Sequence, residues 1–168
     1  PASWYQSANP IFVVLFAPFF AWVWVALGAR NLDPSAPAKF GIALLLLAGG
    51  FAVMMGAAQL VVSSGGKVAP SWLLLTYLLH TFGELCLSPV GLSNVTKLAP
   101  KRFVGQMMGT WFLATAFSET LAALFGKLAA IEVPEGEAMD LVAAAGKYQH
   151  LFWMMLWIGL GCALLAFL

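Results

Sequence analysis

The sequence predicts an all-α fold of several membrane-spanning helices, and three observations support this prediction. The chain has 168 residues, of which 62% are apolar and only 9% are charged, whereas a soluble domain averages about 25% charged residues. The apolar residues gather into five runs, each near the roughly 20 residues that a helix needs to cross a bilayer. Polar connections separate these runs. We therefore expect a multi-pass membrane protein.

The five predicted spans cover residues 10–29, 40–62, 71–95, 103–130 and 148–168. The first begins beside Asn9 and Pro10, and Asn9 most simply caps that helix, because an Asn side chain accepts hydrogen bonds from the first turn. The second span is rich in glycines, which let helices approach closely in lipid. The third carries Gly83, Pro89 and Gly91, so we expect its backbone to be bent or loosened there.

The connections predict the orientation of the chain. Those after the first and third spans contain five basic residues (Arg30, Lys39, Lys97, Lys101, Arg102), against three after the second and fourth (Lys67, Lys127, Lys147). Basic loops stay in the cytoplasm. We therefore expect a cell-membrane protein with its Pro1 end outside and its Leu168 end on the cytoplasmic side. In the last connection, residues 140–146 are predicted to form a short, separate surface helix.

Several function classes have no support in the sequence. The net charge of +1 gives no basic patch for nucleic acid. The two cysteines, Cys86 and Cys162, lie in apolar runs without the spacing of a metal site. The HExxH, GxSxG and Walker patterns of hydrolases and ATPases are absent from the sequence. We expect a protein that is not an enzyme and needs no metal or organic cofactor.

The main candidate for a functional residue is Glu84, an acid in the middle of a long apolar segment. An ionisable group at this depth costs about 2.5–3.5 kcal/mol on insertion scales and is kept where it faces a partner, a cavity or a substrate. None of the basic residues lies at mid-depth in the five spans. The counter-charge is therefore expected to be a proton, the ammonium group of a ligand, or a lysine outside this chain.

Two further residues of the third span share the helical spacing of Glu84. His80 and Ser88 lie four residues before and after it, and residues four apart share a helix face. The three predict one polar stripe that lines a path. The structural alternative is that His80 or Ser88 simply bonds a neighbouring carbonyl.

The fourth span contains two more candidates, Glu119 and Trp111. Glu119 is a second intramembrane acid, for which contact with a neighbouring helix or with Lys127 is the structural alternative. Trp111 lies away from the interface where tryptophan usually anchors a helix, so it either packs against a neighbour or lines a pocket.

Three stretches of the chain resemble the proton-coupled oligopeptide transporters of the major facilitator superfamily. They are NPIFVVLFAPFFAWVW at 9–24, PSW at 70–72 and GELCLSPVGLSNVTKLAPKRFVGQMMGTWFLATA at 83–116. The resemblance covers nearly the whole chain and implies helices eight to twelve of that family, most of its C-terminal bundle. It implies di- and tripeptide substrates, protons as the coupling ion, and uptake by alternating access.

The resemblance also implies roles for individual residues. Glu84 matches the acid that receives the free amino end of the peptide and pairs with a lysine of the N-terminal half during gating. Asn9 matches an asparagine that joins it there. Ser88 and Trp111 match residues lining the side-chain pockets. His80, Phe112, Thr115 and Glu119 are further cavity candidates, although family members often have Gly-Asn where this chain has Ser118-Glu119.

Two alternatives to peptide transport remain at this stage. A carrier of this family for nitrate or another small solute would keep the fold and change the substrate, although Glu84 and Asn9 favour an ammonium over an anion. A structural membrane subunit would use the buried acids for packing. The N-terminal half, with its ExxER motif and facing lysine, is expected as a partner, and five spans without it are expected to be inactive.

Overall fold

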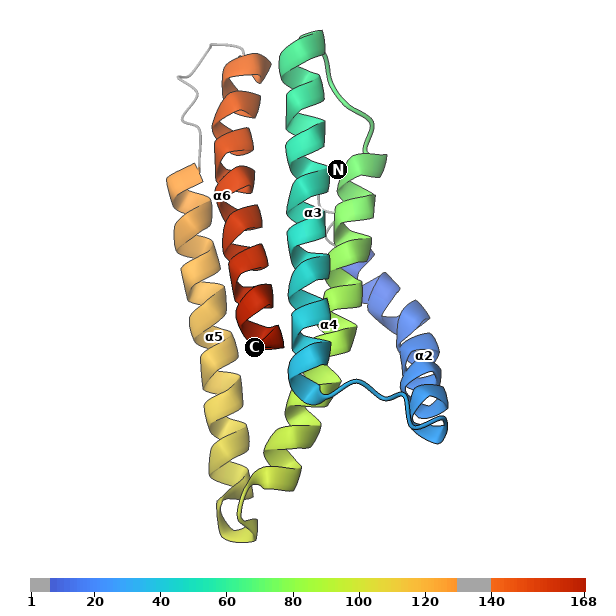
Figure 1. Cartoon of the computed structure of the whole chain (residues 1–168). Helices are drawn as coiled ribbons and strands as arrows, with labels where there is room; N and C mark the ends of the chain where they lie inside the picture. Colours follow the sequence, from blue (N-terminus) through green and yellow to red (C-terminus); the bar gives the residue numbers. More distant parts are fainter. Residues whose placement is uncertain (1–6, 130–139) are drawn as a thin grey trace.

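The computed structural model describes residues 7–129 and 140–168, which form five α-helices and one 3-10 turn. The helices are α2 (Ala8–Ala29), α3 (Ala36–Ser64), α4 (Ser71–Leu98), α5 (Val104–Ala129) and α6 (Leu141–Phe167), and the turn is η1 (Lys101–Phe103). Across Figure 1 they follow the order α5, α6, α3, α4, α2. The prediction of an all-α fold is confirmed.

Four of the described helices are long and apolar enough to cross a membrane: α2, α3, α4 and α6. The fifth, α5, is 26 residues long, but its hydroxyl-bearing and charged residues make it less apolar. A membrane span at α5 therefore stays a prediction.

Local sequence signals explain where two helices begin and one ends. Ser35 caps α3, because its hydroxyl oxygen accepts a hydrogen bond from the Ala38 amide, and Gly65 ends that helix with a φ of +66° that favours glycine. At the start of α6, Asp140 accepts hydrogen bonds from the amides of Val142 and Ala143. Residues 141–146 are thus the first turns of α6, and the prediction of a separate short helix is wrong.

The core of the bundle lies where α3 packs against α4 on one side and α6 on the other. Small residues let these helices approach closely. A Cβ added at Gly83 of α4 would lie 2.8 Å from the Ala43 carbonyl oxygen of α3, and one at Gly159 of α6 would lie 3.1 Å from the Ala48 Cβ. This small-residue interface fixes the position of α4, which carries Glu84.

The two outer helices of the view are packed on fewer sides. Among the described elements α2 packs mainly on α4, and α5 makes only sparse contacts with α4 and α6 (Figure 1). Both helices expose large apolar side chains, such as Trp22 and Val25 on α2 and Leu113 and Phe117 on α5. These faces are suited to lipid or to a second helical bundle.

Candidate functional site

A hydrogen-bonded group of three residues joins the start of α2 to the middle of α4. The Asn9 amide nitrogen donates to Glu84 Oε2 over a long 3.4 Å contact. The Thr81 hydroxyl lies 2.6 Å from Asn9 Oδ1 and also 2.7 Å from the Tyr77 carbonyl oxygen of its own helix. Asn9 and Glu84 are 75 residues apart in the sequence, so their meeting is a product of the fold.

The carboxylate of Glu84 is the open end of this group. Glu84 is exposed, whereas Thr81 is fully buried at 0% exposure. Within the described part of the chain, Asn9 is the hydrogen-bond partner of Glu84, and no lysine or arginine pairs with it. An acid in a membrane-spanning segment is kept where it faces a partner, a cavity or a substrate, so this arrangement can receive a cation from outside the described residues.

The position of Asn9 differs from its predicted role as a helix cap. α2 begins at Ala8, one residue before Asn9. Its N-cap residue is Ser7, whose side chain makes no capping hydrogen bond. Asn9 therefore lies inside the first turn, half-buried, with its amide directed to α4. The capping interpretation is wrong, because the amide bonds α4 instead of its own backbone.

Thr81 is the site residue that sequence reasoning missed. It lies three residues before Glu84 on α4, a spacing that places two side chains on neighbouring faces of a helix. A threonine in an apolar run usually bonds its own backbone, which gives no sign of a second contact. The partner comes from α2, and only the packing of α2 on α4 reveals it.

The polar stripe predicted for His80, Glu84 and Ser88 is divided in the structure. His80 Nε2 lies 3.3 Å from the Leu47 carbonyl oxygen of α3, and its ring meets Phe51 edge-on. Four residues turn a helix by about 400°, so neighbours in the stripe differ by about 40° in direction. That rotation is enough for His80 to face α3. Ser88, one turn beyond Glu84, is half-buried and has no hydrogen-bond partner among the described residues.

Trp111 of α5 packs against α4 two turns beyond Glu84. Its indole covers Gly91, where any Cβ would overlap the ring. Trp111 also lines an apolar pocket of about 300 Å³ with Phe40, Met107 and neighbouring residues of α4. In the described structure, then, Trp111 makes a packing contact in the C-terminal part of α4 and lies apart from the group of Asn9, Thr81 and Glu84.

The remaining candidates of α5 are exposed. Phe112, Thr115 and Glu119 are all exposed in the described structure, and the Thr115 hydroxyl donates to the Trp111 carbonyl oxygen of its own helix. Glu119 has no hydrogen-bond or ion-pair partner within residues 7–129 and 140–168, so the structural alternative, a contact with a neighbouring helix or with Lys127, is not observed there. These side chains are accessible to a ligand because the described helices do not cover them.

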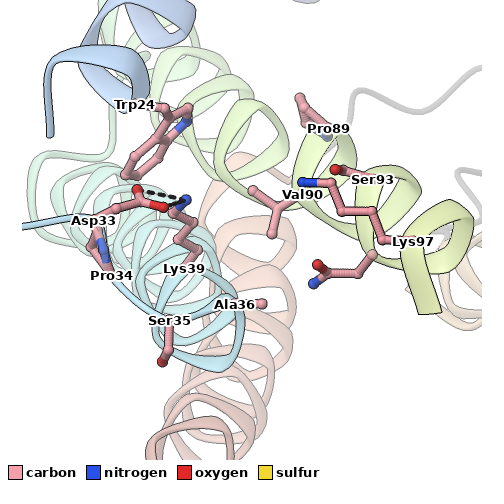
Figure 2. A pocket seen from close by; sticks show the side chains of 11 residues that line it. Trp24, Asp33, Pro34, Ser35, Ala36, Lys39, Pro89, Val90, Ser93 and Lys97 are labelled. Atoms are coloured by element: carbon pink, nitrogen blue, oxygen red, sulfur yellow. Dashed lines mark hydrogen bonds and ion pairs between the residues drawn. The ribbon is translucent and has the colours of Figure 1, made fainter. Parts of the chain in front are cut away.

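A second polar group lies at the end of the bundle where α2 leads into α3. Lys39 is 8% exposed and forms an ion pair with Asp33, with 2.8 Å between its nitrogen and the carboxylate. Figure 2 shows the Trp24 ring beside this pair, and the Lys39 nitrogen lies 4.6 Å from the ring centroid. Together with Ser93 and Lys97 of α4, these residues border a pocket of about 490 Å³.

No cluster of three or more His, Cys, Asp or Glu side chains that could hold a metal ion is found in the described ranges. The two polar groups described above are a hydrogen-bonded group around Glu84 and the ion pair of Lys39 with Asp33. The first group can bind a cation. The second has already neutralised its charges.

Comparison with known proteins identifies the relatives of this chain. The sequence model of the POT family matches residues 1–139. Over 127 residues, the chain is 52% identical to the peptide transporter YePEPT of Yersinia enterocolitica, a match that covers 75% of this chain and 25% of that protein. It is 38% identical to dipeptide and tripeptide permease A of Edwardsiella piscicida, a match that covers 98% of this chain and 32% of the permease.

Solved structures agree with these relatives. The chain superposes with a TM-score of 0.72 and 30% identity on a POT family transporter in complex with a thioalcohol-conjugated peptide, over 95% of this chain and 29% of that one. A mutant of the peptide transporter POT in complex with alafosfalin gives a TM-score of 0.66 and 41% identity, over 95% of this chain and 32% of that one. The chain thus spans about a quarter to a third of the length of the transporters that it matches.

Proposed function

This chain belongs to the POT family, and we propose that it forms most of the C-terminal bundle of a proton-driven carrier for di- and tripeptides. The relatives are named as peptide transporters or as dipeptide and tripeptide permeases. The apolar helices make it a multi-pass membrane protein.

The observation that supports a peptide substrate is the open carboxylate of Glu84. It carries one long hydrogen bond from Asn9 and has no cation beside it among the described residues. The free amino end of a peptide is an ammonium group, which donates hydrogen bonds and carries the missing charge. The Glu84 carboxylate would pair with this ammonium group, and the side-chain oxygen of Asn9, Oδ1, would accept one of the ammonium hydrogens.

Proton coupling can use the same carboxylate. A proton and a peptide ammonium both neutralise Glu84, so they compete for it. A ligand shifts an equilibrium between outward-open and inward-open states only if it binds the two states with different affinity. We infer that the peptide and the proton meet this condition. Glu84 has a charge partner in one of the two states and lacks it in the other, and either ligand can take the place of that partner.

A second bundle is the partner that this function requires. Substrate sites of such carriers lie near mid-membrane between two helical repeats, and the chain spans only a quarter to a third of its relatives. The N-terminal half would cover the exposed faces of α2 and α5 and supply a lysine to face Glu84. In this arrangement Ser88, Trp111, Phe112, Thr115 and Glu119 would border the peptide side chains, and the Leu168 end would lie in the cytoplasm.

Uptake of a labelled dipeptide into proteoliposomes tests the proposal. The full-length protein that contains this chain would be reconstituted and measured with and without an inward proton gradient. We expect uptake that needs the gradient and that an N-acetylated dipeptide inhibits poorly, because acetylation removes the ammonium. Folded protein that carries no dipeptide but carries nitrate or another small solute would contradict the proposal.

A further inference from the structure

We propose that Thr81 is a positioning residue, which fixes the amide of Asn9 so that Asn9 and Glu84 together present hydrogen-bond acceptors to an incoming ammonium group. This inference rests on the proposed peptide function. Thr81 cannot touch the peptide itself, because its side chain is fully buried between α2 and α4. Its effect on binding must therefore pass through Asn9.

The hydrogen-bond inventory shows how Thr81 can act on Asn9. A threonine hydroxyl has one hydrogen to donate, and two acceptors lie within reach, Asn9 Oδ1 at 2.6 Å and the Tyr77 carbonyl oxygen at 2.7 Å. In a regular helix the carbonyl of residue 77 already accepts the amide hydrogen of residue 81. The Tyr77 carbonyl oxygen thus has a donor without the hydroxyl, whereas Asn9 Oδ1 has no other donor among the described residues, so the hydroxyl hydrogen satisfies an otherwise unpaired acceptor when it is donated to Asn9.

The neighbouring carboxylate fixes the same orientation of the amide. If the amide were turned over, Asn9 Oδ1 would face the Glu84 carboxylate, and two acceptors would repel each other. With the amide nitrogen toward Glu84, the nitrogen donates to the carboxylate and Oδ1 receives the Thr81 hydroxyl. A carbonyl oxygen has two lone pairs, so Oδ1 keeps one for an ammonium while Thr81 holds it in place.

Another threonine of the same helix provides a matched control. Thr76 is also buried, at 6% exposure, and its hydroxyl contacts the Trp72 and Gly50 carbonyl oxygens. Like that of Thr81, its hydroxyl lies within hydrogen-bond distance of the carbonyl oxygen four residues earlier and of one group on a neighbouring helix. Its contacts end on backbone atoms of α3 and α4 and do not reach Asn9 or Glu84. Loss of the Thr76 hydroxyl should therefore affect packing alone.

The test compares Thr81→Ser, Thr81→Ala, Thr81→Val and Thr76→Val in the full-length protein. We expect Thr81→Val and Thr81→Ala to raise the KM for a free-amine dipeptide about tenfold and to change the maximal rate less than about twofold, since one positioning hydrogen bond is lost. Thr81→Ser keeps the hydroxyl and should restore KM. Binding of an N-acetylated dipeptide should stay unchanged, so discrimination between free and blocked amines should fall. Thr76→Val should keep the KM of the wild type.

Three results would overturn the inference. They are an unchanged KM in Thr81→Ala, an equal loss in Thr81→Ser and Thr81→Ala, or an equal loss in Thr76→Val. Ser and Ala both lack the methyl group of Thr81 and differ only by the hydroxyl, so this pair decides the question even if the Val variant does not fold. Failure of the wild-type protein to transport any dipeptide would instead contradict the proposed function, which separates the two ideas.

Discussion

The two polar groups of this chain handle charge in opposite ways. At the α2–α3 connection, the buried cation Lys39 lies against the Asp33 carboxylate and over the Trp24 ring. At mid-helix, the Glu84 carboxylate is exposed, and its hydrogen-bond partner among the described residues is the neutral Asn9 amide. A charge with its partner in the same bundle holds helices together. In the proposed function, a charge without such a partner is the one that binds the ligand.

Glu84→Gln should give the largest effect, because it removes the charge while keeping the size and a hydrogen-bonding oxygen for Asn9. In the full-length protein we expect dipeptide uptake to fall about a hundredfold at low substrate, since losing one partner of a desolvated charge pair costs about 2–5 kcal/mol. The amount of protein in the membrane should not change. The measurement is initial uptake against substrate concentration.

Asp140→Asn is the matched control for Glu84→Gln. It also removes one acidic charge, but it keeps an oxygen that can cap α6. Normal uptake by Glu84→Gln would contradict the comparison, because Glu84 would then have no more role in transport than Asp33.

Asp33→Ala should act on stability and leave peptide binding unchanged. It strands Lys39, which is 8% exposed. Breaking a fully buried ion pair costs about 3–5 kcal/mol, but the Asp33 side chain is 43% exposed, so water screens the pair and we expect about 1–2 kcal/mol. Thermal unfolding of the purified full-length protein measures this loss, and the KM for dipeptide serves as the second readout.

The double variant Asp33→Ala with Lys39→Met checks the physical reason for that loss. A methionine needs no charge partner, so the double variant should regain most of the stability that Asp33→Ala loses. A raised KM in Asp33→Ala would show that the ion pair also serves the peptide site, and the division between the two groups would be wrong.

The sequence predicted the fold class and the open acid, since both follow from composition and from the cost of a charge in lipid. It did not predict which face each side chain takes. Thr81, His80 and Trp111 are placed by helices distant in sequence: α2 reaches Thr81, α3 reaches His80, and Gly91 of α4 receives Trp111. Such contacts depend on packing angles that local periodicity does not encode. The role of Asn9 was implied by family resemblance, while its local signal suggested a cap.

Gly91→Ala should have a smaller effect than Asp33→Ala. The added methyl group would overlap the Trp111 indole and displace it, but α5 packs sparsely on α4, so the ring can yield. We expect a loss of about 1 kcal/mol in unfolding free energy, the low end for added bulk at a packed contact. Gly109→Ala, where nothing lies within 4 Å, should instead stabilise the protein by up to about 1 kcal/mol, because alanine has the higher helix propensity.

Selectivity among peptides shows whether Trp111 belongs to the peptide site as well. If the contact with Gly91 only packs α5 on α4, Gly91→Ala should leave the relative uptake of dipeptides with large and small side chains unchanged. A change in that ratio would show that Trp111 belongs to the peptide site with Glu84, as the family resemblance implies. The contact of Trp111 with Gly91 would then serve peptide binding as well as packing.

His80→Leu should give the smallest effect and sharpens the comparison most closely around Glu84. His80 lies four residues from Glu84, yet its ring bonds the Leu47 carbonyl and packs on Phe51 of α3. Losing one long, neutral hydrogen bond should cost about 0.5–1 kcal/mol of stability and leave the dipeptide KM within about twofold of wild type. Thermal unfolding and uptake by the full-length variant measure both. A loss of uptake comparable to that of Glu84→Gln would mean that His80 turns toward Glu84 in the working protein, as the four-residue spacing predicted, and that its contact with α3 belongs to only one state of the transport cycle.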